Sequence, residues 1–213
     1  MTAPTAVAHS HEHAHGHGHA VGRAPVAPAD VMAYLDGEPL GRELLDERLE
    51  RLRDGDAACV LPRADSREGR QLRRWVAQVV ITEQLCVNEL RRRGDAAPET
   101  PAEPIDVSTA IAVGSITAAA LAGSDAVRRV AGIVSAEVRI PAEQLAYAAD
   151  VLGEEPPADP AVPVAGWHRE LLQSARLEAF ARWLNAAMHE RVQLVRGLEH
   201  PGDSNQPDNL HRH

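Results

Sequence analysis

The sequence predicts a mainly α-helical protein with a histidine-rich N-terminal tail. Several long segments repeat apolar residues every three or four positions, as amphipathic helices do. Hydrophobic residues make up 44% of the chain but aromatic residues only 3%, a composition that suits alanine-rich helices better than a β-sandwich. We expect a disordered tail over residues 1–28, a helical domain over residues 29–196 and an irregular tail over residues 197–213.

The helical domain is expected to begin with an extended segment. Residues 31–35 alternate weakly between apolar and other positions and end at Asp36-Gly37, which is a turn signal. Residues 41–54 then carry four leucines at helical spacing and predict a helix. A loop over residues 62–66 follows.

The strongest helical pattern spans residues 68–93. Arg91–Arg93 complement the negative end of this helix, and Gly94 is a natural stop. We expect Glu83 at the edge of the apolar face; the alternative is a buried carboxylate with a partner. Cys86 is expected to be a small buried hydrophobe. The apolar stripe consists of Leu72, Val76, Val79, Glu83, Cys86 and Leu90.

The middle of the chain predicts a linker and two shorter helices. Three prolines between residues 98 and 104 mark the linker. Residues 106–136 are alanine-rich and predict two helices that are broken near Gly123. Ser124 can cap the second of these helices, because its hydroxyl can accept a bond from a free backbone N–H group.

The last part of the domain predicts two more helices. Residues 138–140 favour an extended conformation, and Pro141 opens a helix that ends near residue 152. A proline-rich loop over residues 153–163 precedes a final helix over residues 166–196. The expected core of the domain includes Leu45, Leu72, Val76, Val79, Leu90, Phe180, Leu184 and Met188.

The two tails carry candidate metal ligands. In the N-terminal run, histidines alternate with small or polar residues at His9, His11, His13, His15, His17 and His19. Neutral imidazole binds zinc, nickel and copper, so we expect the run to bind one of these ions. The C-terminal tail adds His200, His211 and His213, with Asp203 and Asp208 between them. Its Pro201-Gly202 turn signal could fold it back toward His189 and Glu190.

Other features limit the classes of function. The net charge of −9 argues against a broad nucleic-acid surface. No segment is apolar for the roughly 18 residues that span a bilayer, and no secretory segment is recognisable, so a cytoplasmic location is expected. Cys59 and Cys86 form no CxxC pair. His168 is expected to be a cap or surface residue. No catalytic triad, phosphate loop or dinucleotide fingerprint is present, so no nucleotide or organic cofactor is expected.

The order of elements resembles the N-terminal domain of SurA-type chaperones, which is similar to a helical domain of trigger factor. The resemblance rests on residues 31–44, 71–85, 89–94, 138–145 and 176–184. It implies a helical domain with an apolar groove that binds a protein or peptide client. Many members of the family also carry a parvulin-type prolyl isomerase domain. The short proline-rich stretch at the corresponding place has no parvulin sequence, so isomerase activity is not expected.

Three interpretations of function remain open. The favoured one is a chaperone-like helical binding module with metal-binding tails. The second is a metalloenzyme or metal-dependent tailoring protein, with ligands from His189, Glu190 and the C-terminal tail; no HExxH-like spacing supports it. The third is a metallochaperone or metal store. A C-terminal tail packed on the helical body with converging histidines would favour the enzyme.

Overall fold

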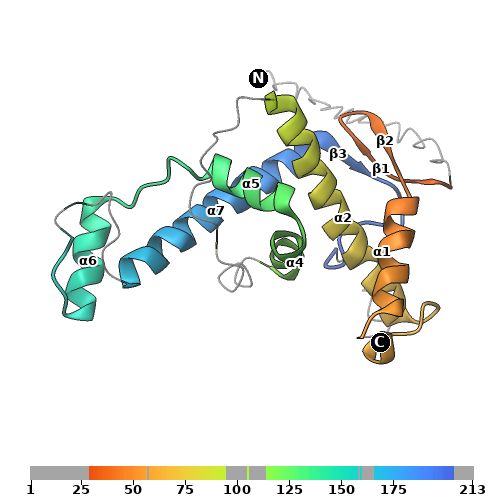
Figure 1. Cartoon of the computed structure of the whole chain (residues 1–213), viewed down its shortest axis with the longest axis horizontal. Coiled ribbons are helices and arrows are strands. Elements are labelled where there is room, and N and C mark those ends of the chain that lie inside the picture. The colour runs from red at the N-terminus through yellow and green to blue at the C-terminus, as the bar shows by residue number, and fades with distance from the viewer. Residues whose placement is uncertain are drawn as a thin grey trace, which may run out of the picture.

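The chain is mainly helical, as its sequence predicts (Figure 1). The structure is a computed structural model that describes residues 29–56, 58–94, 105, 114–157, 159 and 166–203. These residues form six α-helices, one 3₁₀ helix and a three-stranded sheet. The predicted N-terminal tail over residues 1–28 and the linker over residues 98–104 lie outside the described residues.

A β-hairpin opens the domain. Strand β1 (Val31–Leu35) pairs antiparallel with β2 (Glu38–Gly41) through the turn at Asp36 and Gly37, whose φ angles are 53° and 85°. Two positive φ angles give the turn the twist that tight hairpins require, and Asp and Gly are the residues that tolerate them. The extended segment expected from the sequence is therefore confirmed as one arm of a hairpin.

Helix α2 (Arg67–Arg93) runs through the centre of the body, beside α1 (Glu43–Asp54). The short 3₁₀ helix η1 (Ala58–Val60) lies in the connection between them. Ser66 caps α2, since its hydroxyl accepts a 3.0 Å bond from the Gly69 amide. A Cβ atom at Gly69 would lie 1.9 Å from the Arg63 carbonyl oxygen, so this tight entry needs glycine.

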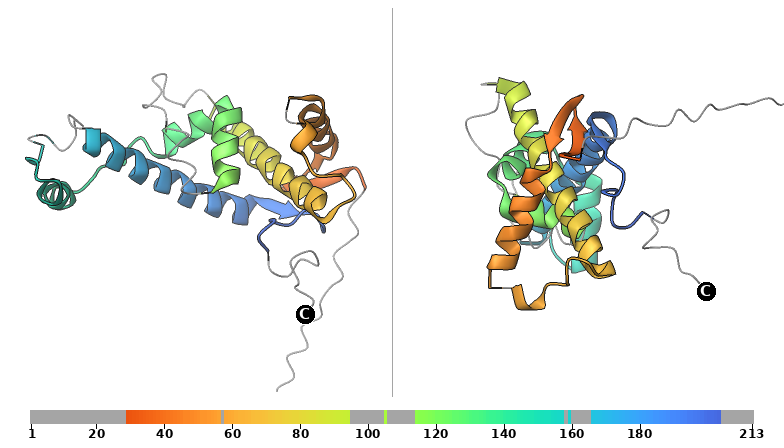
Figure 2. Two further views of the ribbon diagram at one scale, coloured as in Figure 1. Left: turned by 90° about the horizontal axis from the view of Figure 1, so that it is seen from below. Right: turned by 90° about the vertical axis from the view of Figure 1, so that its right-hand side faces the viewer.

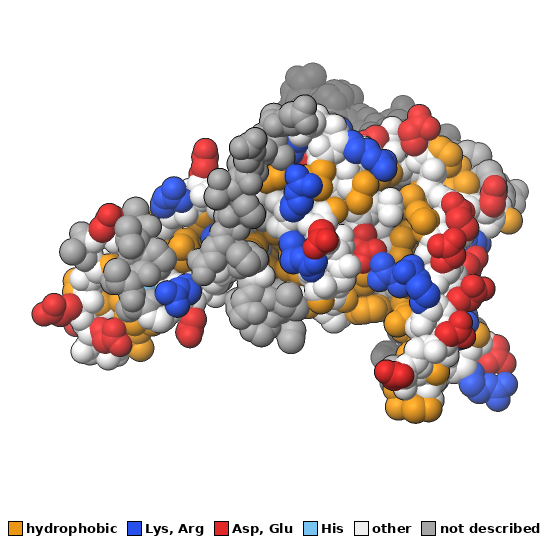
Figure 3. Space-filling model, viewed as in Figure 1, with side chains coloured by type: hydrophobic (Ala, Val, Ile, Leu, Met, Phe, Trp, Pro, Cys, Tyr) orange, Lys and Arg blue, Asp and Glu red, His pale blue; other side chains and the backbone are white. Residues whose placement is uncertain are grey.

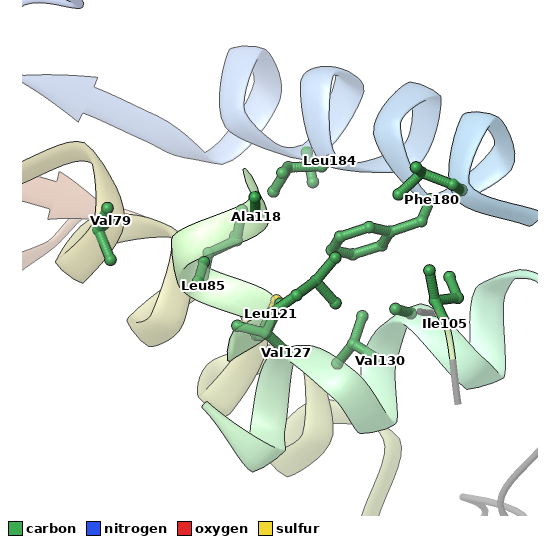
Figure 4. Close-up of a cluster of buried hydrophobic side chains, with 14 of the residues drawn as sticks. Val79, Leu85, Ile105, Ala118, Leu121, Val127, Val130, Phe180 and Leu184 are labelled. Atoms are coloured by element: carbon green, nitrogen blue, oxygen red, sulfur yellow. The ribbon is translucent and has the colours of Figure 1, made fainter. Parts of the chain in front are cut away.

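Helices α4 (Ser115–Gly123) and α5 (Asp125–Val134) pack across α2. The predicted break at Gly123 and the predicted cap are both confirmed, because the Val127 amide donates to the Ser124 hydroxyl at 3.4 Å. Together with α2 and α7 (Gly166–Arg191), these helices enclose the larger of two apolar clusters. Figure 4 shows Phe180 of α7 pointing toward α4 and α5, where it is fully buried.

The last helix is shorter than the sequence suggested. Helix α7 ends at Arg191, and β3 (Val192–Leu194) follows it and pairs antiparallel with β1 in a sheet of order β2-β1-β3. The prediction of a helix to residue 196 is therefore wrong. The free edge of β1 offers backbone partners to this segment, which outweighs the helical spacing of its valines. The first and last parts of the domain thus meet in one sheet.

Helix α6 (Ala142–Leu152) stands apart from the body, beside the first turns of α7 (Figures 1 and 2). The long α7 extends from the sheet out to α6 and joins the two parts. The core prediction is confirmed for Leu45, Val76, Val79, Phe180 and Leu184, which are buried. Leu72, Leu90 and Met188 are only partly buried, packed at the margins of the two clusters.

Candidate functional site

An open apolar groove lies on the outer side of α6. Its volume is about 560 Å³, and its walls are mainly apolar. Among the described residues only four large hydrophobic side chains are strongly exposed, and three of them belong to α6: Tyr147 at 73%, Val151 at 64% and Leu152 at 54%. The groove is lined by Glu143, Gln144, Tyr147, Ala148, Val151 and Leu152 of α6, and by Leu171 of α7.

The sequence of α6 explains why apolar side chains are left outside. Leu145 and Ala149 lie one turn apart and are buried on the inner face. Tyr147 and Val151 repeat the same spacing on the outer face, so the helix is apolar on both sides. Such a helix is normally covered on both sides. The outer face of α6 is therefore suited to contact another molecule.

Acidic side chains outnumber basic ones in the segment that contains α6 and the start of α7. From residue 137 to residue 172 the chain has seven carboxylates and only two guanidinium groups, and all nine are exposed. Figure 3 shows apolar side chains between acidic ones at this end of the molecule. The groove therefore has a mainly apolar lining with one carboxylate, Glu143, in a segment that carries a net negative charge. The carboxylates belong to Glu137, Glu143, Asp150, Glu154, Glu155, Asp159 and Glu170; the guanidinium groups belong to Arg139 and Arg169.

A polar contact joins the end of α6 to the start of α7. The Trp167 indole N–H donates to the Glu154 carboxylate at 2.7 Å. The next residue, His168, is buried with 1% exposure, so the prediction of a cap or surface position for it is wrong. His168 lies on the first turn of α7, twelve residues before Phe180. Twelve residues are about three and a third helical turns, so the two side chains lie on different sides of the helix. The apolar face that contains Phe180 therefore gives no sign that His168 is buried.

Most of the predicted metal ligands lie outside the described residues. These are His9, His11, His13, His15, His17, His19, Asp208, His211 and His213. His189 and Glu190 are exposed on the last turn of α7. Within the described part of the chain, no three His, Cys, Asp or Glu side chains come together as metal ligands would.

His200 is the one histidine of the C-terminal tail that the structure describes. It lies in the turn expected at Pro201-Gly202, where the Gly202 amide donates to His200 Nδ1 at 3.0 Å. A neutral imidazole that accepts at Nδ1 carries its proton on Nε2 and cannot bind a metal through that atom. Metal binding by His200 would therefore break this turn bond, whichever of the two nitrogens held the ion.

His200 also lines a second cavity of about 350 Å³ between α2, α4 and α7. The Trp75 indole closes one side of it by donating to the Ser115 hydroxyl at 2.9 Å. Among the residues that the structure describes, no Asp, Glu, Lys or Arg lines this cavity. The other lining residues are Gln78, Thr82, Gly114, Ile116, Thr117, Leu184, Asn185, Met188 and Pro201.

A cluster of charged side chains ties the hairpin, α2 and α7 together. The side chain of Arg191, at the end of α7, is only 7% exposed and bonds Asp36 and Glu89, each at 2.7 Å. Arg93 bonds the other oxygen of Glu89 at 2.7 Å. Arg92 also contacts Glu89, at 3.2 Å. Of the three arginines predicted to complement the end of α2, Arg92 and Arg93 therefore both pair with this carboxylate.

The charged groups in this cluster shift one another's pKa values. The bond from Arg191 lowers the pKa of Asp36, and the bond to Asp36 raises the pKa of Arg191. Burial raises the pKa of Glu89, but the bonds from Arg93 and Arg191 outweigh burial and the pKa is lowered. Burial, assisted by Glu89, raises the pKa of the Cys86 thiol to about 12, so Cys86 is inert as a nucleophile. Both cysteines are unpaired.

Glu83 is buried rather than placed at the edge of the apolar face. It is 7% exposed and accepts a 2.5 Å bond from Arg48 of α1. The alternative interpretation, a buried carboxylate with a partner, is therefore correct. The partner lies 35 positions away in the sequence, which is why the helical stripe alone did not reveal it.

Residues 31–68 match a family described as a family of unknown function (DUF7158). The match covers the hairpin, α1 and the connection into α2, and the description of the family names no activity. No curated protein and no solved structure matches the chain. Among the described residues, no helix is long and apolar enough to cross a membrane.

The groove on α6 was not recognised from the sequence. The sequence predicted the helix itself, but its exposed apolar face has the same residue types as a buried one. The only available signal was that residues 142–152 are apolar on both sides of a short helix, followed by two glutamates. The Arg191 cluster was not predicted either, because Arg191 lies 155 positions from Asp36 and 102 positions from Glu89 in the sequence.

Proposed function

We propose that this chain is a SurA-like, chaperone-type module that binds apolar segments of partner polypeptides in the α6 groove. The exposure of Tyr147, Val151 and Leu152 around one open groove carries the proposal. Exposed apolar surface of this kind is typical of protein-binding sites, because covering it releases ordered water. The predicted resemblance in the order of elements supports the same function.

The proposed activity is binding without prolyl isomerisation. Only residues 153–165 connect α6 to α7, at the place where the family carries its isomerase domain. The negative charge of the chain and of the groove disfavours nucleic acid as the partner. A cytoplasmic location and a protein or peptide client are part of the proposal.

Replacing apolar side chains of the groove is expected to weaken client binding. Tyr147→Ser with Val151→Ser should reduce affinity for a permanently unfolded protein at least about tenfold, because two side chains lose their apolar contact. Binding is measured by fluorescence anisotropy with labelled, reduced and carbamidomethylated ribonuclease A, an unfolded and basic protein. Both side chains are exposed, so the fold should be unaffected.

Val60→Ser is the matched control for this experiment. Val60 is 77% exposed, on η1 at the other end of the molecule. The Val60→Ser variant should bind the client as tightly as the unchanged chain. Equal binding by all three proteins would place client binding elsewhere and contradict the proposal.

We also propose that the N-terminal histidine run binds zinc, nickel or copper, as a second property of the chain. The alternation of imidazoles with small residues supports it. We do not extend the proposal to a catalytic metal, which needs about three fixed ligands. The described residues bring no such set together. His200, His211 and His213 are a weaker candidate set for the same ions.

Deleting residues 1–20 is expected to remove most metal binding. The affinity of the complete chain should fall as pH drops below about 6.5, where imidazole gains a proton. Bound metal is measured by elemental analysis after dialysis. The free energy of unfolding should not change, since the deleted residues precede the hairpin. An unchanged metal content after deletion would assign binding to other ligands.

A further inference from the structure

The chemistry of the α6 groove points to the form of its occupant. Resting on the proposed function, we infer that the groove binds an amphipathic helix of about three turns whose apolar stripe is flanked by basic residues. The inference follows from the backbone of α6, the length of its apolar face and the charge around it.

An extended segment would fit this surface poorly. The wall of the groove is a helix, whose own backbone groups are bonded within α6 and offer no ladder to a neighbouring strand. A strand laid on Tyr147 and Val151 would lose water from its backbone without gaining bonds. A helix satisfies its own backbone and can present side chains alone, so it avoids this cost.

The length of the apolar face sets the length of the partner. The lining positions of α6 run from Glu143 to Leu152, which is ten residues and about 15 Å of helix axis. A partner helix packed along α6 would contact it over about the same length. Its apolar residues would repeat every three or four positions, as the outer face of α6 does.

The charge around the groove selects a basic partner. Glu143 lines the groove. Asp150 and Glu155 are exposed and lie within three positions of the lining residues Val151 and Leu152 in the sequence. Apolar and acidic side chains are adjacent at the end of the molecule that contains α6 (Figure 3). A second copy of this chain would bring the same carboxylates opposite one another, so like charges oppose pairing of two α6 faces. A helix with lysines or arginines beside its apolar stripe gains attraction instead.

Three synthetic peptides of 14 residues test the inference. The first has leucines at helical spacing and lysines on the flanks; the second replaces two central residues by proline; the third has glutamate for every lysine. Fluorescence anisotropy at low salt should show the first peptide binding at least about tenfold more tightly than either of the others. Raising the salt concentration should weaken binding of the first peptide.

Variants of the chain test whether the carboxylates near the groove, rather than acidic residues elsewhere, select the peptide. Glu143→Gln, Asp150→Asn and Glu155→Gln together should reduce the preference for the lysine peptide over the glutamate peptide about tenfold. Neutralising Glu47, Glu50 and Asp54 on α1 in the same way should leave the preference unchanged. Tyr147→Ser with Val151→Ser should abolish binding of the lysine peptide.

The outcomes distinguish this inference from the proposed function. If the proline peptide binds as well as the lysine peptide, and both depend on Tyr147 and Val151, the groove binds polypeptides but not as helices. If the glutamate peptide binds equally well, the charge selection is wrong. If the unfolded protein binds in the groove and no peptide does, the inference fails and the proposed function stands. If neither binds, both fail.

Discussion

Phe180→Ala is expected to lower the free energy of unfolding by about 4 kcal/mol, as deletion of a buried aromatic ring commonly does. The ring is completely buried among α2, α4, α5 and α7, whose contacts hold the body together. Removing it deletes apolar contacts and leaves a cavity that four helices cannot close without moving. Urea unfolding followed by circular dichroism measures the change.

Two controls make this result specific to packing. Phe180→Leu keeps most of the apolar volume and should recover most of the lost stability. Val60→Ala changes an exposed side chain and should alter the free energy of unfolding by no more than about 0.5 kcal/mol. A loss at Phe180→Ala within that same margin would contradict the assignment of this face of α7 to the core.

Arg191→Met is expected to cost about 3 kcal/mol, the lower end of the range for removing one partner of a buried ion pair. The substitution leaves Glu89 buried without one of its three arginine partners and removes the bond to Asp36 at the hairpin turn. Arg182→Met is the control, since Arg182 is exposed and lies 3.9 Å from Glu178. It should change stability by less than about 1 kcal/mol.

The same variant should alter the dependence of stability on pH. The pKa values of Asp36 and Glu89 are lowered in the folded chain, so each carboxylate contributes stability above its unfolded pKa, about 4. That contribution is lost as pH falls from about 4 through the lower folded values. Arg191→Met should make stability fall less steeply in this acidic range. An equal slope for both proteins would show that Arg191 does not set these pKa values.

The local elements could be predicted from the sequence because their signals are local. The hairpin turn at Asp36-Gly37, the cap at Ser124 and the stop at Gly94 depend on residues within a few positions. The long stripe of α2 predicted both the helix and its buried face. In each case the chemistry of neighbouring residues determines the backbone, and no distant partner is required.

The remaining features depend on contacts between distant residues. Strand β3 forms because β1 offers a free edge about 160 positions earlier in the chain, and this overrides a helical pattern. The bond between Arg48 and Glu83 likewise joins two helices. The groove on α6 exists because Tyr147, Val151 and Leu152 are exposed rather than packed against another described element. An exposed apolar face and a buried one have the same residue types, so the sequence alone does not distinguish them.

Amide hydrogen exchange on the complete chain, with and without the unfolded client, tests the central claim most directly. The claim is that polypeptides bind on the outer face of α6. We predict slower exchange for residues 142–152 and for the first turns of α7 when client is added, with no change at η1. Slower exchange confined to other elements, or unchanged exchange along α6 under conditions where the client is bound, would contradict it.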